Sequence, residues 1–237
     1  MDEDRTAMKR RAGERAAADV PDGAVVGLGT GSTAAHAIDA LGRRVRAGAE
    51  LVGVPTSHQS RRRAIDAGIE VREPDQVDEI DVAVDGADRV VLADDRAGED
   101  WPDSVLVKGG GAAHAREKVV DAAADRLFVV VDPSKRAPDL ARAVPVAVLP
   151  VATATVSERV ERRGGEPVVR EATGKDGPVV TDNGNWVLDC EFGTVGRPAA
   201  LAEWLSGVPG VVAHGLFVDL ADAVYVGRPA GVERLGV

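Results

Sequence analysis

Short apolar segments that end in glycine-rich turns and lead into helical stretches recur through the first two thirds of this sequence. Residues 24–28 form the first such segment, and residues 29–31 turn the chain into a stretch in which Ala34, Ile38 and Leu41 share one helical face. Near-continuous apolar strands separated by helices are typical of a parallel sheet that is covered on both faces. The pattern therefore predicts an α/β fold, a doubly wound and mostly parallel sheet.

The pattern changes after Pro138. Asn183-Gly184 stands between two apolar, β-branched runs, which is a strong hairpin signal because both turn positions need positive φ. This part predicts a smaller α+β domain, after which segments 211–218 and 223–226 return the chain to the first domain. The predicted domains are residues 1–137 plus 212–237 and residues 138–211, with strands at 51–54, 69–71, 80–84, 90–92, 105–107, 127–131 and 146–149 and helices at 58–67, 112–124, 151–163 and 198–205.

The net charge of −10, from 39 acidic and 29 basic residues, repels nucleic-acid phosphates and anionic membranes. It also repels an anionic substrate, so a phosphate site must be built locally from N–H groups and a few cations. Residues 1–20 are charged throughout, unlike a signal peptide, and no apolar run is long enough to span a bilayer. The single cysteine, Cys190, fits a reducing cytosol and a packed strand position. We expect a cytoplasmic protein with no nucleic-acid or membrane partner.

Residues 27–34, Gly-Leu-Gly-Thr-Gly-Ser-Thr-Ala, lie between a predicted strand and a predicted helix. The glycines allow a ligand to approach the backbone, N–H groups at a helix N-terminus favour an anion, and Ser32 and Thr33 add hydroxyl donors. The segment also fits the dinucleotide pattern G-x-G-x-x-A, but that site needs an acid after the second strand, where residues 55–57 are Pro-Thr-Ser. We predict a phosphate cradle, with a purely structural turn as the alternative.

Two carboxylates follow the predicted strand 80–84, in the run Asp85-Gly86-Ala87-Asp88. Ligands of open α/β sheets bind at the carboxyl ends of the strands. Asp85 and Asp88 can point into one crevice and hydrogen-bond sugar hydroxyls. A solvated, Asp-rich turn is the structural alternative.

Residues 106–113 repeat this architecture with a cation, because Lys108 precedes Gly109-Gly110-Gly111. Three successive glycines cost conformational entropy and fit a place where backbone amides pack against a ligand. Lys135, after the strand 127–131, brings a second cation to the same edge of the sheet. Glu117 lies in the intervening helix, where an exposed, ion-paired position is the usual interpretation.

In this order, the segments resemble the A-type ribose-5-phosphate isomerase family over nearly the whole chain. The resemblance implies a doubly wound α/β domain with an inserted ferredoxin-like domain, assembled as a homodimer or homotetramer. It also implies an enzyme that interconverts ribose 5-phosphate and ribulose 5-phosphate. The matching motifs are G-L-G-T-G-S-T-A-A from Gly27, V-P-T-S from Val54, V-D-G-A-D from Val84, K-G-G-G-A-A from Lys108, R-E-K from Arg116, D-P-S-K from Asp132, T-D-N-G-N from Thr181, P-G-V-V from Pro209 and G-L-F from Gly215.

By this resemblance Glu117 is the general base that moves a proton between C2 and C1 through a cis-enediolate. Lys108 and the glycine N–H groups stabilise the oxyanion, while Asp85 and Asp88 orient hydroxyls. Which loop holds the phosphate and which holds the reacting end of the sugar stays open. The residues expected to bind substrate are Thr30, Gly31, Ser32, Thr33, Asp85, Gly86, Ala87, Asp88, Lys108, Gly109, Gly110, Gly111 and Lys135.

The sequence departs from the family in three places. Arg89 replaces an acidic residue, Ala112 replaces a common fourth glycine, and the segment 93–103 is longer and more acidic. None of these removes a proposed catalytic group. The four histidines show no metal-ligand spacing, so we expect neither a metal nor another cofactor.

A phosphosugar-binding sensor without turnover is the alternative function. Such a regulator normally carries a basic helix-turn-helix, and residues 1–25 are too short for one. A sugar-phosphate deaminase or an acyl-CoA transferase on a similar sheet is a further alternative. The lysine and glycine run at 108–111, followed by Glu117, argues against both.

Overall fold

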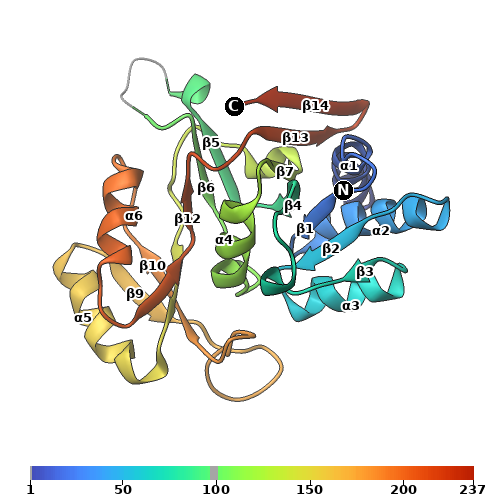
Figure 1. The fold of residues 1–237 in the computed structure, drawn as a ribbon. Helices are drawn as coiled ribbons and strands as arrows, with labels where there is room; N and C mark the ends of the chain where they lie inside the picture. Colours follow the sequence, from blue (N-terminus) through green and yellow to red (C-terminus); the bar gives the residue numbers. More distant parts are fainter. Residues whose placement is uncertain (1, 97–100) are drawn as a thin grey trace. The chain divides into compact units, whose positions relative to one another are not determined.

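The computed structural model describes residues 2–96 and 101–237, and the chain divides into two compact units (Figure 1). The four residues 97–100 of the acidic segment 93–103 lie outside the described residues. Within the described ranges, none of the helices combines the length and hydropathy that a bilayer crossing needs. The first unit comprises Met1–Ala87, Arg116–Arg136 and Leu220–Val237, and the second comprises Asp88–Ala115 and Ala137–Asp219.

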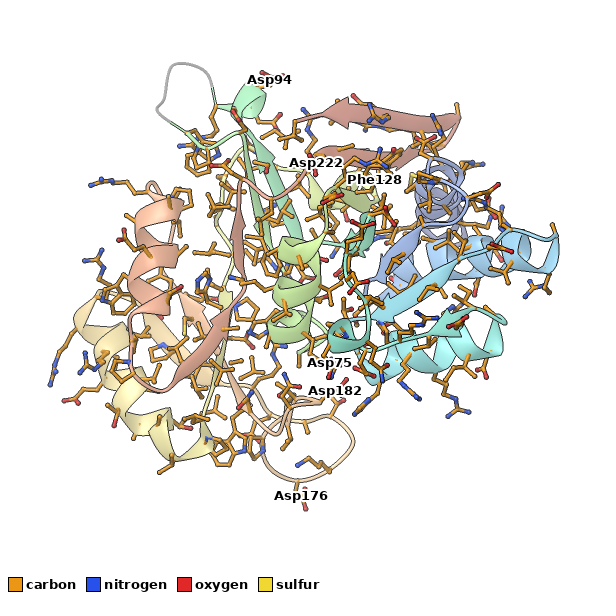
Figure 2. All side chains as sticks on the ribbon, in the orientation of Figure 1. Asp75, Asp94, Phe128, Asp176, Asp182 and Asp222 are labelled. Atoms are coloured by element: carbon orange, nitrogen blue, oxygen red, sulfur yellow. The ribbon has the colours of Figure 1, made fainter. Side chains whose placement is uncertain are left out.

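A seven-stranded sheet forms the centre of the first unit, in the order β14-β13-β7-β4-β1-β2-β3. Every neighbouring pair is parallel except β13 and β14, so the predicted mostly parallel sheet is confirmed. Asp222, labelled in Figure 2, secures the pairing of β13 with β7 by accepting a 2.7 Å hydrogen bond from the Leu127 N–H. The strands are β1 (Val25–Leu28), β2 (Val52–Pro55), β3 (Glu70–Val71), β4 (Val82–Gly86), β7 (Leu127–Val131), β13 (Ala223–Arg228) and β14 (Gly231–Gly236).

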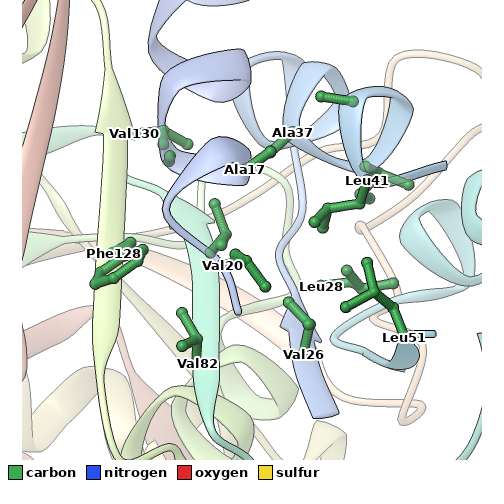
Figure 3. Close-up of a cluster of buried hydrophobic side chains, with 14 of the residues drawn as sticks. Ala17, Val20, Val26, Leu28, Ala37, Leu41, Leu51, Val82, Phe128 and Val130 are labelled. Carbon is green, nitrogen blue, oxygen red and sulfur yellow. The ribbon is translucent and has the colours of Figure 1, made fainter. Parts of the chain in front are cut away.

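Helices cover both faces of this sheet, as the doubly wound fold requires. On one face, shown in Figure 3, Ala17 of α1 and Leu41 of α2 belong to the same buried cluster as Val82 of the sheet. On the other face, Val120 of α4 packs with Val54. The helices of this part are α1 (Asp2–Ala18), α2 (Ser32–Arg46), α3 (His58–Asp66) and α4 (His114–Ala123), with the 3-10 helices η1 (Pro74–Gln76) and η3 (Pro133–Lys135).

The second unit contains a four-stranded antiparallel sheet in the order β11-β8-β10-β9. Its chain order, β8-α5-β9-β10-α6-β11, is that of the predicted ferredoxin-like domain. A separate three-stranded sheet has the order β12-β6-β5. The elements are β5 (Arg89–Leu92), β6 (Ser104–Val107), β8 (Val144–Val148), β9 (Glu166–Val169), β10 (Trp186–Glu191), β11 (Val211–His214), β12 (Leu216–Val218), α5 (Thr153–Arg162), α6 (Pro198–Ser206), η2 (Ala93–Asp95) and η4 (Pro150–Ala152).

The three-stranded sheet is where the structure departs from the sequence-based expectation. The predicted strands at 90–92 and 105–107 form, but they pair antiparallel with each other as β5 and β6. No α-helix lies in the described part of the connection between them, and parallel neighbours need a long crossover, usually helical. Residues 88–115 and 212–219 therefore belong to the second unit rather than with the large parallel sheet.

A turn forms at Asn183-Gly184, but it is not the predicted two-residue turn with positive φ at both positions. Of the two residues only Gly184 has a positive φ, and its N–H donates to the Thr181 carbonyl over 2.8 Å. Gly184 has a φ of 81°, and the Thr181 N–H donates to the Asn185 carbonyl over 2.8 Å. The predicted first strand of the hairpin is reduced to a single bridge between Val180 and Trp186.

Candidate active site

The predicted polar residues of the first unit follow adjacent strands at the carboxyl edge of the large sheet. The N–H groups of Thr30 and Gly86 donate to the same oxygen, Oδ1 of Asp85, over 3.0 and 2.6 Å. Asp85 is only 1% exposed. Gly29 is required beside it, because a Cβ at this position would lie 2.1 Å from Asp85 Oδ1. The loop after β1 and the end of β4 therefore hold a buried carboxylate in a fixed orientation.

The Thr30 hydroxyl joins the same loop to the segment after β2. Its Oγ1 lies 2.8 Å from Thr56 Oγ1 and 2.7 Å from Ser57 Oγ. Ser57 also caps α3, because its side chain accepts a 3.1 Å hydrogen bond from the Ser60 N–H. Hydroxyl groups therefore stand after β2, where a dinucleotide site would need an acidic side chain.

The N-terminus of α2 meets a cation from α1. The helix begins at Ser32 after Gly31, which has a φ of 107° and no side chain to cap the first-turn N–H groups. The Lys9 Nζ donates to Ser32 Oγ over 3.0 Å. A helix N-terminus beside an ammonium group suits a phosphate. Lys9 was not predicted as a site residue, since nothing in a uniformly charged segment distinguishes this lysine.

The turn after β7 is held by a second cation from α1. Asp132 accepts hydrogen bonds from the Ser134 N–H over 3.0 Å and from Arg5 Nε over 3.1 Å. Burial by itself would raise the pKa of Asp132, but the hydrogen bonds from Ser134 and Arg5 hold that pKa below its ordinary value. This ordered turn, η3, ends at Lys135 and so fixes the backbone of that predicted binding residue.

Glu117 lies in the first turn of α4 and is only 5% exposed. The opposite end of α4 is at the amino edge of the sheet, because Ala124 bridges to Ile80, just before β4. Val120, one turn after Glu117 on the same helical face, packs against β1, where a Cβ at Gly27 would lie 2.7 Å from Val120 Cγ1. Glu117 is therefore a buried carboxylate on the sheet-facing side of α4, toward the carboxyl edge.

In the second unit, the β5–β6 pair places Asp88 beside Lys108. The Asp88 N–H donates to the Val107 carbonyl over 2.8 Å, and Asp88 Oδ2 accepts a 2.6 Å hydrogen bond from the Gly110 N–H. Lys108 is 2% exposed, and its Nζ lies 5.3 Å from the centre of the Phe217 ring. A buried cation and a carboxylate that is bound to the glycine loop thus share one end of this sheet.

Arg89, which departs from the family motif, points to other partners than Asp88. Its Nη2 lies 3.4 Å from both Asp139 Oδ1 and the Ala141 carbonyl. Asp88 has a different basic neighbour in Arg142, whose Nη2 is 3.8 Å from Asp88 Oδ1. Alternation along the strand separates the side chains of residues 88 and 89, so Arg89 leaves the Asp88 carboxylate in place.

The glycine loop after Lys108 has a backbone that side chains would obstruct. Gly109 has a φ of 105°, and a Cβ there would lie 2.7 Å from Nδ1 of the buried His114. Ala112, at a position where the family commonly has glycine, adopts a φ of 58° and donates from its N–H to the Gly109 carbonyl over 3.0 Å. The loop is thus a tight turn with positive φ at Gly109, which glycine favours, and at Ala112, where the side chain disfavours it.

The predicted site residues are divided between the two units. In the described parts of the chain, no three or more His, Cys, Asp or Glu residues are grouped so as to hold a metal ion. Buried carboxylates suit proton transfer, whereas N–H groups and cations suit an anionic ligand. The first unit holds Thr30, Gly31, Ser32, Thr33, Asp85, Gly86, Ala87, Glu117 and Lys135, and the second holds Asp88, Lys108, Gly109, Gly110 and Gly111.

Residues 52–231 match the family described as Ribose 5-phosphate isomerase A (phosphoriboisomerase A). The chain is 57% identical to the ribose-5-phosphate isomerase A of Halorubrum lacusprofundi, over 96% of this chain and 95% of that protein. Among solved structures, it resembles ribose 5-phosphate isomerase A from Methanocaldococcus jannaschii, with a TM-score of 0.91, 37% identity and coverage of 100% of both chains. It also resembles a D-ribose-5-phosphate isomerase in complex with phospho-erythronic acid, with a TM-score of 0.89, 39% identity and coverage of 97% and 98%.

Proposed function

This chain belongs to the ribose 5-phosphate isomerase A family, and on that premise we propose that it interconverts D-ribose 5-phosphate and D-ribulose 5-phosphate. The observation that carries the proposal is the buried Glu117 carboxylate of α4, a helix packed against a sheet whose carboxyl edge also carries the uncapped N-terminus of α2. The reaction is the aldose–ketose isomerisation of the non-oxidative pentose phosphate branch. We place it in the cytoplasm, in a homodimer or homotetramer.

We assign the phosphate to the N-terminus of α2, with Lys9 as its cation. Lys9 Nζ and Ser32 Oγ are 3.0 Å apart, so one phosphate oxygen can bind both groups. The first-turn N–H groups of α2 add donors, and the helix dipole favours a dianion at this position. A solved relative binds phospho-erythronic acid, which like the sugar substrate joins a phosphate to a short hydroxylated chain.

Glu117 is assigned the proton transfer. Its carboxylate removes the proton from C2 of the open-chain aldose, the electron pair forms the C1=C2 double bond, and the negative charge moves to O1. Delivery of a proton from the Glu117 carboxyl group to C1, after exchange with solvent in part of the turnovers, together with transfer of the O2 hydroxyl proton to O1, gives the ketose. One buried carboxylate suffices for both steps because C1 and C2 are adjacent.

The remaining residues are assigned to charge stabilisation and orientation. Lys108 and the N–H groups of Gly109 and Gly111 supply positive charge for the enediolate oxygen, while the Gly110 N–H of the same loop holds Asp88. Asp85, held by the N–H groups of Thr30 and Gly86, offers its second oxygen to a sugar hydroxyl. Asp88 orients a further hydroxyl, and one of the two aspartates assists opening of the furanose ring.

Turnover of ribose 5-phosphate by the wild type and by Glu117→Gln, in EDTA and in D2O, tests this proposal. We expect wild-type conversion in EDTA with solvent deuterium in the sugar, and a loss of kcat of about 10²-fold or more in the variant. Glu79→Gln, at an exposed residue of the same unit, is the matched control and should keep wild-type activity.

Full activity of Glu117→Gln would show that another group is the base. Activity that EDTA abolishes and a divalent ion restores would overturn the metal-independent mechanism. Binding of ribose 5-phosphate by the folded wild type without any conversion would support the sensor function instead.

A further inference from the structure

Arg170, which directly follows β9, holds the carbonyl side of the glycine loop. Its Nη1 donates to the Gly109 carbonyl over 2.8 Å and to the Gly110 carbonyl over 3.3 Å. The loop comes from the chain after β6, so this contact joins residues that are about sixty positions apart. A single guanidinium group therefore fixes two consecutive carbonyls of the Lys108–Gly111 segment.

Fixing these carbonyls also fixes the N–H groups that follow them. In a trans peptide, the C=O of one residue and the N–H of the next point in opposite directions. The Gly109 carbonyl thus sets the direction of the Gly110 N–H, which reaches Asp88 Oδ2 over 2.6 Å. In the same way, the Gly110 carbonyl sets the direction of the Gly111 N–H, away from Arg170. Glycine has the widest conformational freedom of any residue, so such an anchor removes a large part of the loop's disorder.

Asp189 of β10 holds Arg170 in turn. Arg170 Nε lies 2.8 Å from Asp189 Oδ2, and Nη2 lies 2.5 Å from Oδ1, which is a bidentate pair. Asp189 is opposite Val168 in the β9–β10 ladder, so Arg170, two residues after Val168, belongs to the same face of the four-stranded sheet. The Arg170 and Asp189 side chains are only 18% and 32% exposed. The pair is therefore built into the sheet rather than formed between mobile surface side chains.

We propose that Arg170, oriented by Asp189, is a positioning residue for the isomerisation, which it serves by presetting the N–H groups of the glycine loop. The inference rests on the proposed function, in which the Gly111 N–H stabilises the enediolate oxygen and the Gly110 N–H holds the Asp88 carboxylate. Donors that are fixed before the reaction stabilise developing charge without reorganisation, so their loss acts on the transition state more than on substrate binding. Lysine cannot replace this arginine, because one ammonium group lacks the planar fork that reaches two carbonyls and a carboxylate together.

The test compares Arg170→Ala, Arg170→Lys and Asp189→Asn with the wild type in steady-state kinetics and in hydrogen exchange of the peptide that contains residues 108–112. We expect kcat to fall about 10- to 100-fold in Arg170→Ala with less than a threefold change in KM, and exchange of the loop to become faster. For Arg170→Lys and Asp189→Asn, we expect values of kcat and of loop exchange between those of Arg170→Ala and those of the wild type. Millimolar guanidinium should restore part of kcat in Arg170→Ala alone. Arg162→Ala, which removes the Arg162–Glu158 ion pair on α5 of the same unit, is the matched control and should leave kcat and loop exchange unchanged.

If the wild type converts ribose 5-phosphate but folded Arg170→Ala keeps the wild-type kcat, or changes only in KM, the inference is wrong and the proposed function stands. If Arg170→Ala failed to fold, Arg170→Lys and Asp189→Asn would decide by the same two readouts. A wild type without turnover would refute the proposed function, and loop exchange that Arg170→Ala does not alter would refute the anchoring by itself.

Discussion

The N–H of Thr30 donates a 3.0 Å hydrogen bond to Oδ1 of Asp85, which ties the loop after β1 to the end of β4. The two residues are 55 positions apart in the chain, and Asp85 is almost completely buried. The backbone of Gly29 passes directly beside this carboxylate. The orientation of Asp85 thus depends on an N–H donor on one side and on the absence of a side chain on the other.

Gly29→Ala should displace the Asp85 carboxylate. The added Cβ would lie 2.1 Å from Oδ1, closer than any tolerated contact, and Asp85 has little room to move because it is 1% exposed. We expect about 1–3 kcal/mol of destabilisation and a loss of kcat/KM of about 10²-fold, measured by urea unfolding and ribose 5-phosphate turnover. Gly231→Ala, where no atom lies within 4 Å of the added Cβ, should leave both nearly unchanged. Equal behaviour of the two variants would contradict this account.

Lys9→Ala should weaken binding of the phosphate more than it slows the chemistry. Lys9 contacts Ser32 at the N-terminus of α2. Its proposed role is to bind the phosphate, whereas the proton transfer is assigned to Glu117. We expect KM for ribose 5-phosphate and the inhibition constant of inorganic phosphate to rise about tenfold or more, with kcat within threefold of wild type. Lys175→Ala removes the same charge from an exposed position and serves as the control. An inhibition constant for phosphate that did not change would place the phosphate elsewhere.

Local patterns in the sequence were enough to predict most of the elements, because short-range signals specify them. The glycine turn after β1 and the Asn183-Gly184 turn are examples. The helix α1 was not predicted, since its buried face consists of small residues such as Ala12 and Ala16 among many charges. The pairing of β5 with β6 was not predicted either, because the sequence of an apolar strand does not indicate which sheet the strand will join.

In the candidate site, too, the residues with a local sequence signal were predicted and those without one were not. The residues at strand ends, such as Asp85 and Lys108, follow from the rule that ligands bind at the carboxyl edge. Lys9 and Arg170 could not be found in this way, because their roles come from hydrogen bonds to residues more than twenty positions away. No local pattern separates them from the other basic side chains of the chain.

Cys190 should not react with thiol reagents while the protein is folded. The residue is fully buried in β10, and burial, with a smaller contribution from Asp189, raises its pKa to about 12. At pH 8 only roughly one part in ten thousand of the thiol is then ionised, and access is blocked as well. We expect labelling to be at least about 10²-fold slower in native protein than in urea, as followed by absorbance with a disulfide reagent. Rapid labelling of the native protein would show that β10 opens readily.

Burial of Lys118 should make the stability of the protein depend on pH above neutrality. Burial lowers the pKa of Lys118 from 10.5 to about 7. Between these two values the unfolded chain binds a proton at Lys118 that the folded chain has released, so the free energy of unfolding rises with pH in this window. The stabilising contribution is complete above about pH 10.5 and is lost as the pH falls toward 7.

Lys118→Met removes this proton linkage. We expect the variant to be more stable than the wild type at pH 7, by about 1–3 kcal/mol, and the difference to shrink as the pH approaches 10. Urea unfolding at pH 7, 8.5 and 10 measures both the sign and the trend. Lys175→Met, at an exposed lysine, should differ from the wild type by an amount that does not change with pH. If the Lys118→Met difference were equally independent of pH, Lys118 would keep its charge in the folded protein, and α4 would have to provide it with compensating partners.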